Sequence, residues 1–291
     1  METIQSLAHL GSDQLFAAFS EAFKDYELQL SPDELEVMIS RRGYVPELSF
    51  GAFESDRLVS FTLNGIGNFN EIKTAYDTGT GTIEAYRGKG LASRIFQDSL
   101  PELKKAGVQQ YLLEVLQHNT GAVSVYRKQG FEVSREFNYF VEQSENVRLE
   151  KYQLPAGYRI QPIDLSLKEQ MIACQDFTPS WQNSFESVER RLVDFHMWGA
   201  FEGETLAGYC IFEPNSGDIT QLAVSPSHRN RGLATCLLRE AAQENRHKNL
   251  KLINTDIRCE AMTRWAESVG LTLQGKQFEM VREIKDHYLL D

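Results

Sequence analysis

Two copies of one short pattern contain residues whose types and spacing could bind an anion. Residues 87–92 and 229–234 both read Arg-x-x-Gly-x-Ala, and each copy follows a strand-like run and precedes an amphipathic helix. Backbone N–H groups at a helix N-terminus bind anions, and an arginine adds a planar cation suited to phosphate oxygens. The pattern therefore predicts a site for the pyrophosphate of a nucleotide cofactor, and the chain contains it twice.

Glu114 and His118 are candidates for general-base chemistry. Glu114 lies in the middle of the apolar run 111–116, where burying a carboxylate costs free energy unless it is paired or its pKa is raised. Either state suits a base, but the same carboxylate could equally pair with a neighbouring arginine in a structural role. His118 has a suitable intrinsic pKa, although its position at a strand end favours a solvated loop residue.

A wider repeat shows that the doubling extends over the whole chain. The sequence Gly-Ala-Phe-Glu occurs at 51–54 and again at 199–202, and the segment 126–131 corresponds to 266–271. Because these landmarks and the arginine patterns occur in the same order, we predict tandem copies of one α/β unit, residues 1–150 and 157–291. The polar stretch 142–146 and the turn at 155–157 form the predicted junction.

The elements that must position these residues are predicted to recur in both copies. For the first copy we expect helices at 15–23 and 33–39, a hairpin at 48–53 and 58–64, an extended run at 74–83, a helix from 91 interrupted near Pro101, a strand at 111–116, and a helix ending at Gly130. For the second copy we expect a helix at 187–195, a hairpin at 198–202 and 206–212, a strand at 219–224, a helix to about 244, a strand at 250–253 and a helix at 260–268. Strands next to a hairpin and packed by helices form a mixed α/β sheet.

Composition limits the class of protein. No apolar run approaches the ~18 residues of a membrane span, and the N-terminus lacks the basic start of a secretory signal. The net charge of −11 argues against a nucleic-acid partner. Four dispersed cysteines without C-x-x-C spacing indicate reduced thiols and a cytoplasmic protein, with neither disulfides nor a zinc or other metal site: Cys174, Cys210, Cys236 and Cys259.

The arginine pattern, together with the run Asn119…Ala122…Tyr126…Gly130-Phe131, resembles the GCN5-related N-acetyltransferase (GNAT) superfamily in a tandem two-domain form. The resemblance covers essentially the whole chain and is more specific in the first half. It implies two tandem GNAT-like domains, each a mixed, mostly antiparallel sheet flanked by helices with a splayed central strand pair. It also implies acetyl-CoA as co-substrate, direct acetyl transfer to a primary amine of a small molecule or peptide, and no metal. The oligomeric state is left open, a homo-oligomer included.

The resemblance assigns cofactor contacts in both copies. Thr82 and Ile83 would offer backbone N–H and C=O groups to the pantetheine and the acetyl oxygen. Asn119 would hold the pantetheine arm, cap the next helix, or do both. The pyrophosphate loop would comprise Arg87, Gly88, Lys89, Gly90, Leu91 and Ala92, with Arg229, Gly232 and Ala234 as its counterparts in the second copy.

The resemblance also assigns acid–base roles. Tyr126 occupies the place of a tyrosine that protonates the departing CoA thiolate, with a core tyrosine as the structural alternative. The spacing from Glu114 to Asn119 and Tyr126 is similar to that of the ribosomal-protein alanine N-acetyltransferases, which makes Glu114 the preferred base. Asp77 is the second base candidate and a substrate-side residue, although Asp77-Thr78-Gly79 reads as a turn or bulge; a water is a further alternative. Tyr26 is a candidate substrate contact.

The second copy lacks these groups. The same spacings place Asn254, Cys259 and Ala266 where the first copy has Glu114, Asn119 and Tyr126, so residues 157–291 are predicted to be catalytically degenerate. The second copy retains the residues of the cofactor loop, so whether it binds acetyl-CoA is left open. Two alternative functions remain at this point: a non-catalytic acyl-CoA-binding sensor and a protein N-terminal acetyltransferase. The sequence does not identify the acceptor.

Overall fold

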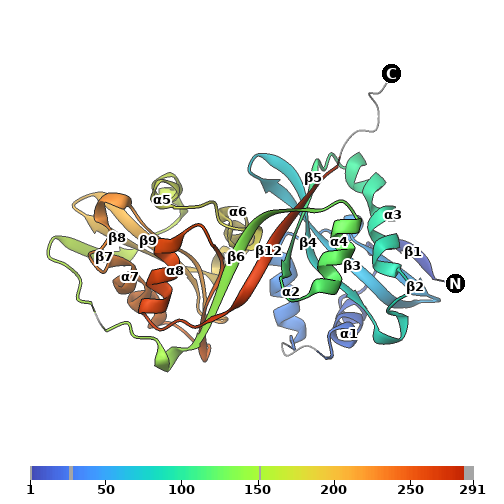
Figure 1. Ribbon diagram of the computed structural model, residues 1–291, viewed down its shortest axis with the longest axis horizontal. Helices are drawn as coiled ribbons and strands as arrows, with labels where there is room; N and C mark the ends of the chain where they lie inside the picture. The colour runs from blue at the N-terminus through green and yellow to red at the C-terminus, as the bar shows by residue number, and fades with distance from the viewer. Residues whose placement is uncertain (1, 26–28, 151, 285–291) are drawn as a thin grey trace, which may run out of the picture. The chain divides into compact units, whose positions relative to one another are not determined.

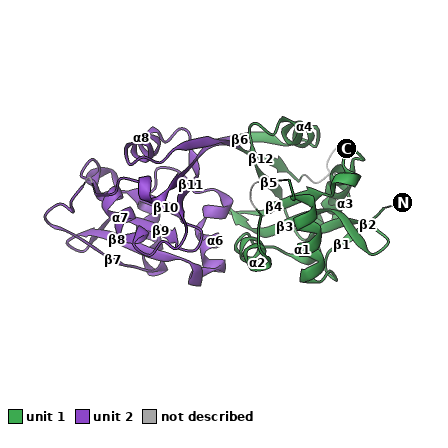
Figure 2. Cartoon of the chain, turned by 90° about the horizontal axis from the view of Figure 1, so that it is seen from below, with its two compact units in different colours: residues 1–134, 278–291 green, residues 135–277 purple. Residues whose placement is uncertain are grey.

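The computed structural model describes residues 2–25, 29–150 and 152–284 (Figure 1). The chain forms two compact units: unit 1 consists of residues 1–134 and 278–291, and unit 2 of residues 135–277 (Figure 2). Two tandem units agree with the sequence repeat. Their limits differ from the expected 1–150 and 157–291, because one long strand from each copy contributes residues to both units.

Unit 1 is a sheet covered by helices. Its strands follow the order β1-β2-β3-β4-β5-β12, antiparallel from β1 to β4 and parallel between β4 and β5. Its elements are β1 (Thr3–Ser6), α1 (Ser12–Ala22), α2 (Pro32–Arg41), β2 (Phe50–Glu54), β3 (Arg57–Phe69), β4 (Ile72–Thr82), α3 (Leu91–Lys105), β5 (Gln110–Leu116), α4 (Thr120–Lys128) and the end of β12 (Leu273–Glu283). Short 3-10 helices lie at η1 (Pro46–Leu48) and η2 (Glu84–Tyr86).

Unit 2 repeats this arrangement in the order β6-β11-β10-β9-β8-β7. Its elements are β6 (Glu132–Gln143), β7 (Tyr158–Pro162), α5 (Lys168–Cys174), α6 (Phe185–Arg190), β8 (His196–Glu202), β9 (Thr205–Glu213), β10 (Asp218–Val224), α7 (Leu233–Ala242), β11 (Asn249–Asp256) and α8 (Glu260–Ser268). Its 3-10 helices are η3 (Ser144–Asn146), η4 (Leu165–Leu167), η5 (Trp181–Asn183), η6 (Leu192–Asp194) and η7 (Pro226–His228).

The central parallel strands of each unit separate after a short paired stretch. In unit 1, β4 residues 74–76 pair with β5 residues 110–112, and both strands continue beyond this ladder. A bulge in β4 at Thr78 shifts its register against β3 at the point where the separation begins. In unit 2, the β10–β11 ladder consists of Asp218 opposite Lys251. The splayed central strand pair predicted from the family resemblance is therefore present in both copies.

The last strand of each copy belongs largely to the unit of the other copy. Most of β6 lies in unit 2, where Phe140 and Val141 pair with β11. The end of β12 lies in unit 1, where Ile284 N donates to Gln109 O at 2.8 Å. Met280 of β12 is fully buried in the unit 1 core. This exchange explains why the structural units and the sequence repeat have different limits.

Helix α3 differs from its prediction in one respect. It continues through Pro101 to Lys105, so the predicted interruption is wrong. The proline removes the hydrogen bond to the carbonyl of residue 97, but Gln97 is exposed and water can solvate that carbonyl. The opposite face of the helix stays anchored in the core by residues at three- and four-residue spacing: Leu91, Ile95, Phe96, Ser99 and Leu103.

The described residues lack two features, a membrane-spanning helix and a cluster of metal ligands. None of their helices combines the length and apolar character needed to cross a bilayer. Nor do they contain a group of three or more His, Cys, Asp or Glu side chains that could hold a metal ion.

Candidate functional site

The loop before α3 has the geometry of an anion cradle. Gly88 and Gly90 adopt φ values of 77° and 72°, a left-handed conformation that glycine tolerates without strain. Gly90 is the N-cap of α3 and provides no side chain to cap the first helical N–H groups. A Cβ atom added at either glycine would meet nothing within 4 Å, so the space in front of these amides is open.

The arginine that begins each loop is hydrogen-bonded to the preceding strand. Arg87 Nε donates to Thr82 O at 3.1 Å, and its Nη2 donates to Ala22 O at 2.9 Å. In the second copy, Arg229 Nε donates to Val224 O at 2.8 Å, which is the same contact with the strand end. Both guanidinium groups therefore hold the loop against the preceding strand, and the phosphate contact expected from the sequence stays a prediction.

The backbone of Ile83 is also engaged within the protein. Ile83 N donates to Val59 O at 3.0 Å, and Ile83 O accepts from Tyr86 N at 2.8 Å. The Thr82 hydroxyl is hydrogen-bonded to Ser60 Oγ at 2.7 Å, and the Thr82 carbonyl accepts from Arg87. These bonds fix the strand exit, so the cofactor contacts predicted for Ile83 would have to share backbone groups that are already hydrogen-bonded.

The second loop has the same backbone but a covered surface. Asn230 and Gly232 adopt φ values of 59° and 83°, and Gly232 is the N-cap of α7. A Cβ atom at Gly232 would lie 2.8 Å from the ring of Tyr152. That residue is anchored by its carbonyl, which accepts from Arg239 Nη1 at 2.7 Å. The connector between the copies therefore occupies the space that is open at the first loop.

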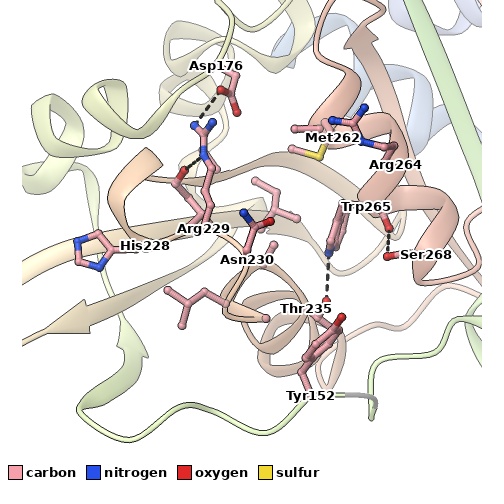
Figure 3. A pocket seen from close by; sticks show the side chains of 17 residues that line it. Tyr152, Asp176, His228, Arg229, Asn230, Thr235, Met262, Arg264, Trp265 and Ser268 are labelled. Carbon is pink, nitrogen blue, oxygen red and sulfur yellow. Dashed lines mark hydrogen bonds and ion pairs between the residues drawn. The ribbon is translucent and has the colours of Figure 1, made fainter.

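A cavity of about 460 Å³ opens at this loop, next to α7 and α8 (Figure 3). Its lining includes loop residues, namely Arg229, Asn230, Gly232, Leu233 and Ala234. Arg229 lies in its wall, with Nη2 2.8 Å from Asp176 Oδ1. Trp265 donates its indole N–H to Thr235 Oγ1 at 3.1 Å, which holds the ring between the two helices (Figure 3). The cavity is rimmed by Tyr152 and has a floor of β10 residues, Leu222, Ala223 and Val224.

Tyr126 meets Asp77 beside the splayed strands of unit 1. The Tyr126 hydroxyl donates to Asp77 Oδ2 at 3.2 Å, and Thr80 Oγ1 donates to the same oxygen at 2.8 Å. Asp77 Oδ1 is buried and has no hydrogen-bond partner within the described part of the chain. Burial raises the pKa of the Asp77 carboxyl to about 6, although the hydroxyls of Thr80 and Tyr126 and the backbone N–H of Gly79 favour its ionised form.

Glu114 meets Tyr76 at the same splay. A hydrogen bond joins the Tyr76 hydroxyl to the half-buried Glu114 carboxylate, and burial, reinforced by that charge, raises the pKa of Tyr76 well above its usual value. Arg42, the residue that ends α2, donates Nη1 to the Thr78 carbonyl at 2.9 Å and opposes this effect on Tyr76 electrostatically. The neighbouring residues thus give Glu114 a fixed polar partner in an otherwise apolar strand.

The Tyr126–Asp77 pair and the Tyr76–Glu114 pair lie on opposite faces of the sheet. Successive strand residues point to alternate faces, and Ala75, Tyr111 and Leu113 belong to the core that Tyr126 also contacts. Asp77 therefore shares the face of Ala75, whereas Glu114, next to Leu113, points to the other face. A group in the gap between β4 and β5 would have Tyr126 on one side and Glu114 on the other.

The remaining predicted residues of unit 1 are placed as follows. Asn119 is the N-cap of α4, and its Oδ1 accepts from Ala122 N at 3.2 Å, which is the capping role anticipated for it. His118 is exposed. Asp77 lies within β4 beside the bulge at Thr78. Tyr26 lies outside the described residues.

The equivalent positions of unit 2 hold inert or engaged groups. Cys259 is the N-cap of α8, as Asn119 is of α4, and Ala266 lies fully buried seven positions later. Asn254 donates Nδ2 to Ser180 Oγ at 2.9 Å and accepts from Gln277 Nε2 at 2.8 Å. Neither Asn254 nor Ala266 provides an acid–base group at the positions that correspond to Glu114 and Tyr126.

Sequence reasoning missed three residues that shape these sites. Tyr76 and Thr80 flank Asp77 in a threonine- and glycine-rich strand, and only the pairing of β4 with its neighbours shows which groups they meet. Tyr152 follows an unremarkable polar connector, and no local pattern indicates that it reaches Gly232.

Each unit has a pair of splayed parallel strands, and a helix with a glycine N-cap follows the first strand of the pair. Two such units in one chain define a tandem GNAT-type protein. A model of the acetyltransferase (GNAT) family matches residues 12–131 and 169–264, which together form most of the chain. The chain belongs to this family, and its activity class is that of an N-acetyltransferase.

Curated relatives match part of the chain. N-alpha-acetyltransferase 30 of Schizosaccharomyces pombe is 28% identical over 106 residues, which cover 35% of this chain and 70% of that protein. N-alpha-acetyltransferase MAK3 of Arabidopsis thaliana is 27% identical over 105 residues, 36% of this chain and 55% of that protein. The match thus spans little more than half of the second relative.

Solved structures match the whole chain. A tandem GNAT protein from the clavulanic acid biosynthesis pathway superposes with a TM-score of 0.75 at 12% identity, covering 98% of this chain and 99% of that chain. A GCN5-related N-acetyltransferase from Sphaerobacter thermophilus gives a TM-score of 0.72 at 14% identity, covering 99% and 98%. These similarities establish a shared fold.

Proposed function

We propose that unit 1 is an acetyl-CoA-dependent N-acetyltransferase that moves an acetyl group directly to a primary amine. The observation that carries the proposal is the position of Tyr126 and Glu114 on opposite faces of the gap between β4 and β5. Direct transfer needs a base on the side of the incoming amine and an acid on the side of the departing sulfur. The positions of Glu114 and Tyr126 on the two sides of the splay support these two roles.

The first loop fits the cofactor. The amides near Gly88 and Gly90 face open space at the uncapped N-terminus of α3, where backbone N–H groups and the helix dipole favour a pyrophosphate. Lys89 lies over the Tyr86 ring at 4.5 Å and adds positive charge beside the loop. When bound, acetyl-CoA supplies an activated acetyl group on a thiol leaving group.

The side chains then divide the proton transfers. Glu114 accepts a proton from the acceptor amine, and its hydrogen bond from Tyr76 fixes the orientation of the carboxylate. Tyr126 supplies the proton that the leaving sulfur takes up. Its ring packs against Phe131 with centroids 5.7 Å apart, which holds the hydroxyl beside β4.

The two copies differ in what they can bind. The ring of Tyr152 covers Gly232 in unit 2, whereas the loop of unit 1 is open. Arg229 is paired with Asp176 and the Val224 carbonyl, so it provides no free cation for phosphate. We therefore expect one equivalent of acetyl-CoA per chain, bound by unit 1.

The N-terminal amine of a protein or peptide is the acceptor class that the relatives favour. Both curated matches are named N-alpha-acetyltransferases, and the Glu114 and Tyr126 spacing agrees with that class. A free small-molecule amine is the other candidate. A peptide acceptor would give turnover that depends on the residues following the amine, because an extended peptide contacts the enzyme along its backbone.

Thiol release from acetyl-CoA, measured against a panel of small amines and N-terminal peptides, tests the proposal. We expect turnover with a clustered set of acceptors. The change Tyr126→Phe should lower kcat by ~10²–10⁴-fold with little change in the calorimetric Kd for acetyl-CoA. The matched control is Tyr139→Phe, a half-buried tyrosine of β6 within unit 2.

Two results would contradict the proposal. Binding of acetyl-CoA without turnover for any acceptor would support a non-catalytic sensor of acyl-CoA. Full activity of the Tyr126→Phe variant would remove Tyr126 from the mechanism.

A further inference from the structure

The carboxyl group of Asp77 has an unequal environment. Its Oδ2 accepts from both Tyr126 and Thr80, at 3.2 and 2.8 Å. Its Oδ1 is buried without a hydrogen-bond partner in the residues that the structure describes. The backbone N–H of Gly79 is a further, weaker donor that favours the ionised carboxylate. Burial outweighs these donors, so the site favours a carboxyl group that holds an exchangeable proton.

The position of Asp77 separates it from the acceptor side. It lies on the sheet face of Ala75, next to Tyr126 and opposite to the face of Glu114. The sequence suggested Asp77 as a substrate-side residue or a second base. Its contacts place it instead behind the hydroxyl that, in the proposed function, faces the leaving sulfur.

We propose that Asp77 is a positioning residue that orients the Tyr126 hydroxyl and resupplies its proton. This inference rests on the proposed function, in which Tyr126 is the general acid. As the Tyr126 O–H bond breaks and its proton passes to the sulfur, the Asp77 O–H bond breaks and that proton passes to the tyrosine oxygen. The step leaves a thiol, a neutral Tyr126 and an ionised Asp77: two protons each move to the next group, and the net change is the transfer of one proton from Asp77 to the sulfur.

Simple acidity favours this relay over a lone tyrosine. A free tyrosine has a pKa of about 10 and a free thiol about 8.5, so transfer from tyrosine alone would be uphill by roughly thirtyfold in equilibrium. Proton transfer from tyrosine alone would also leave a tyrosinate anion beside the Asp77 carboxyl group. When Asp77 supplies the proton, its transfer to the thiolate is favourable in free energy, and no two anions lie next to each other.

Several groups face Asp77 and contribute to its titration. The hydroxyls of Thr80 and Tyr126 and the backbone N–H of Gly79 lower the pKa of Asp77, and so does the positive charge of Arg42, the C-cap residue of α2. From β5, Tyr111 interacts electrostatically with Asp77, and its own hydroxyl is hydrogen-bonded to Asn64 of β3. Tyr76 on β4 also feels the charge of Asp77. The effect of burial, which raises the pKa of Asp77, outweighs the effects of the groups that lower it.

The pH profile of kcat with the best acceptor is the first test. The relay requires Asp77 to hold a proton, so kcat should fall with rising pH as Asp77 ionises. The change Thr80→Val removes a donor that lowers the pKa of Asp77 and should move this alkaline limb to higher pH. Asp77→Asn keeps an oxygen that can accept from Tyr126 but has no proton to pass on, so the limb should disappear and kcat at pH 6 should fall roughly tenfold or more.

The two residues should also act as a unit. The double variant with Asp77→Asn and Tyr126→Phe should be no slower than the slower single variant, because removing one end of a relay already disables the other. Independent effects that multiply in the double variant would overturn the relay. An unchanged alkaline limb in Asp77→Asn would overturn it as well, because a merely structural role needs no titration.

A titration without cofactor provides a readout independent of activity. In protein labelled with ¹³C at aspartate carboxyls, the resonance lost in Asp77→Asn identifies Asp77. We expect its midpoint to rise in the Tyr126→Phe variant, because that change removes a donor to the ionised form. A midpoint that does not respond to Tyr126 would show that the two groups are uncoupled and would overturn the proposal.

The outcomes separate this proposal from the proposed function. A wild-type protein without turnover, or a fully active Tyr126→Phe variant, overturns the function and the relay together. An inactive Tyr126→Phe variant with an Asp77→Asn variant of wild-type rate and pH profile overturns the relay alone.

Discussion

The change Asp77→Asn should alter how the stability of unit 1 depends on pH. Burial raises the pKa of Asp77 to about 6 in the folded protein, against 3.8 for an ordinary aspartate. The folded state therefore holds this proton more tightly than the unfolded state. As pH rises from about 4 to 6, the wild type loses stability that an asparagine, which does not titrate, would not lose.

The size of the effect follows from the two pKa values. Each pKa difference of one corresponds to about 1.4 kcal/mol, so the penalty on the ionised wild type reaches about 3 kcal/mol at pH 7. At pH 4 the same expression gives about 0.5 kcal/mol. The free energy of unfolding of Asp77→Asn minus that of wild type should therefore increase by about 2.5 kcal/mol between pH 4 and pH 7. The constant offset between an Asn and a protonated Asp does not enter this increase.

Urea unfolding at a series of pH values measures the difference. All three tryptophans lie between residues 181 and 265, so their fluorescence reports unit 2, whereas far-UV circular dichroism reports both units. The matched control is Asp98→Asn, an exposed aspartate of α3, because solvent surrounds that side chain in both the folded and unfolded chain. A difference for Asp77→Asn that stays constant within ~0.5 kcal/mol from pH 4 to 7 would refute the reasoning.

Three further predictions concern the two loops and the base. The change Gly90→Ala places a Cβ at a φ of 72° and should lower the free energy of unfolding of unit 1 by about 1 kcal/mol, measured by chemical unfolding. It should also weaken acetyl-CoA binding, measured by calorimetry. The control is Gly203→Ala, at a φ of 60° in a β-turn of unit 2. Tyr152→Ala should uncover Gly232 and raise the calorimetric stoichiometry of acetyl-CoA from one towards two; an unchanged value of one would show that other groups close that loop. Glu114→Gln should lower kcat by ~10²–10⁴-fold at neutral pH in the thiol-release assay with little change in the Kd for acetyl-CoA, and an active variant would leave Asp77 or a water as the base.

Local patterns predicted the features that depend on nearby residues. The glycine-containing loops, the helices that follow them and the cap at Asn119 each follow from a few consecutive side chains, and the structure contains them. The splayed strand pair followed from the family resemblance. The continuation of α3 through Pro101 was missed because the anchoring of its apolar face outweighs one lost hydrogen bond.

Contacts between distant residues could not be predicted. Arg87 donates to Ala22, which precedes it by 65 positions, and no local signal distinguishes that use of a guanidinium from a phosphate contact. The meeting of Tyr126 with Asp77 depends on the packing of α4 on β4, across 49 positions. The strand exchange was not predicted, because β6 and β12 have similar patterns of buried and exposed residues and either strand could complete either sheet.

The exchanged strands have a consequence for the history of the chain. Unit 1 obtains the buried Met280 and the strand next to β5 from the second copy, so a gene that lost its second half would leave unit 1 without its last strand. The second copy therefore completes the fold of unit 1, although it has Asn254 and Ala266 where the first copy has Glu114 and Tyr126. A fragment ending at residue 150 would retain β6 in place of β12, and two such fragments could restore the missing strands by exchanging them with each other. The duplicated chain is the covalent form of such a pair, free to specialise one half while the other half continues to complete its fold.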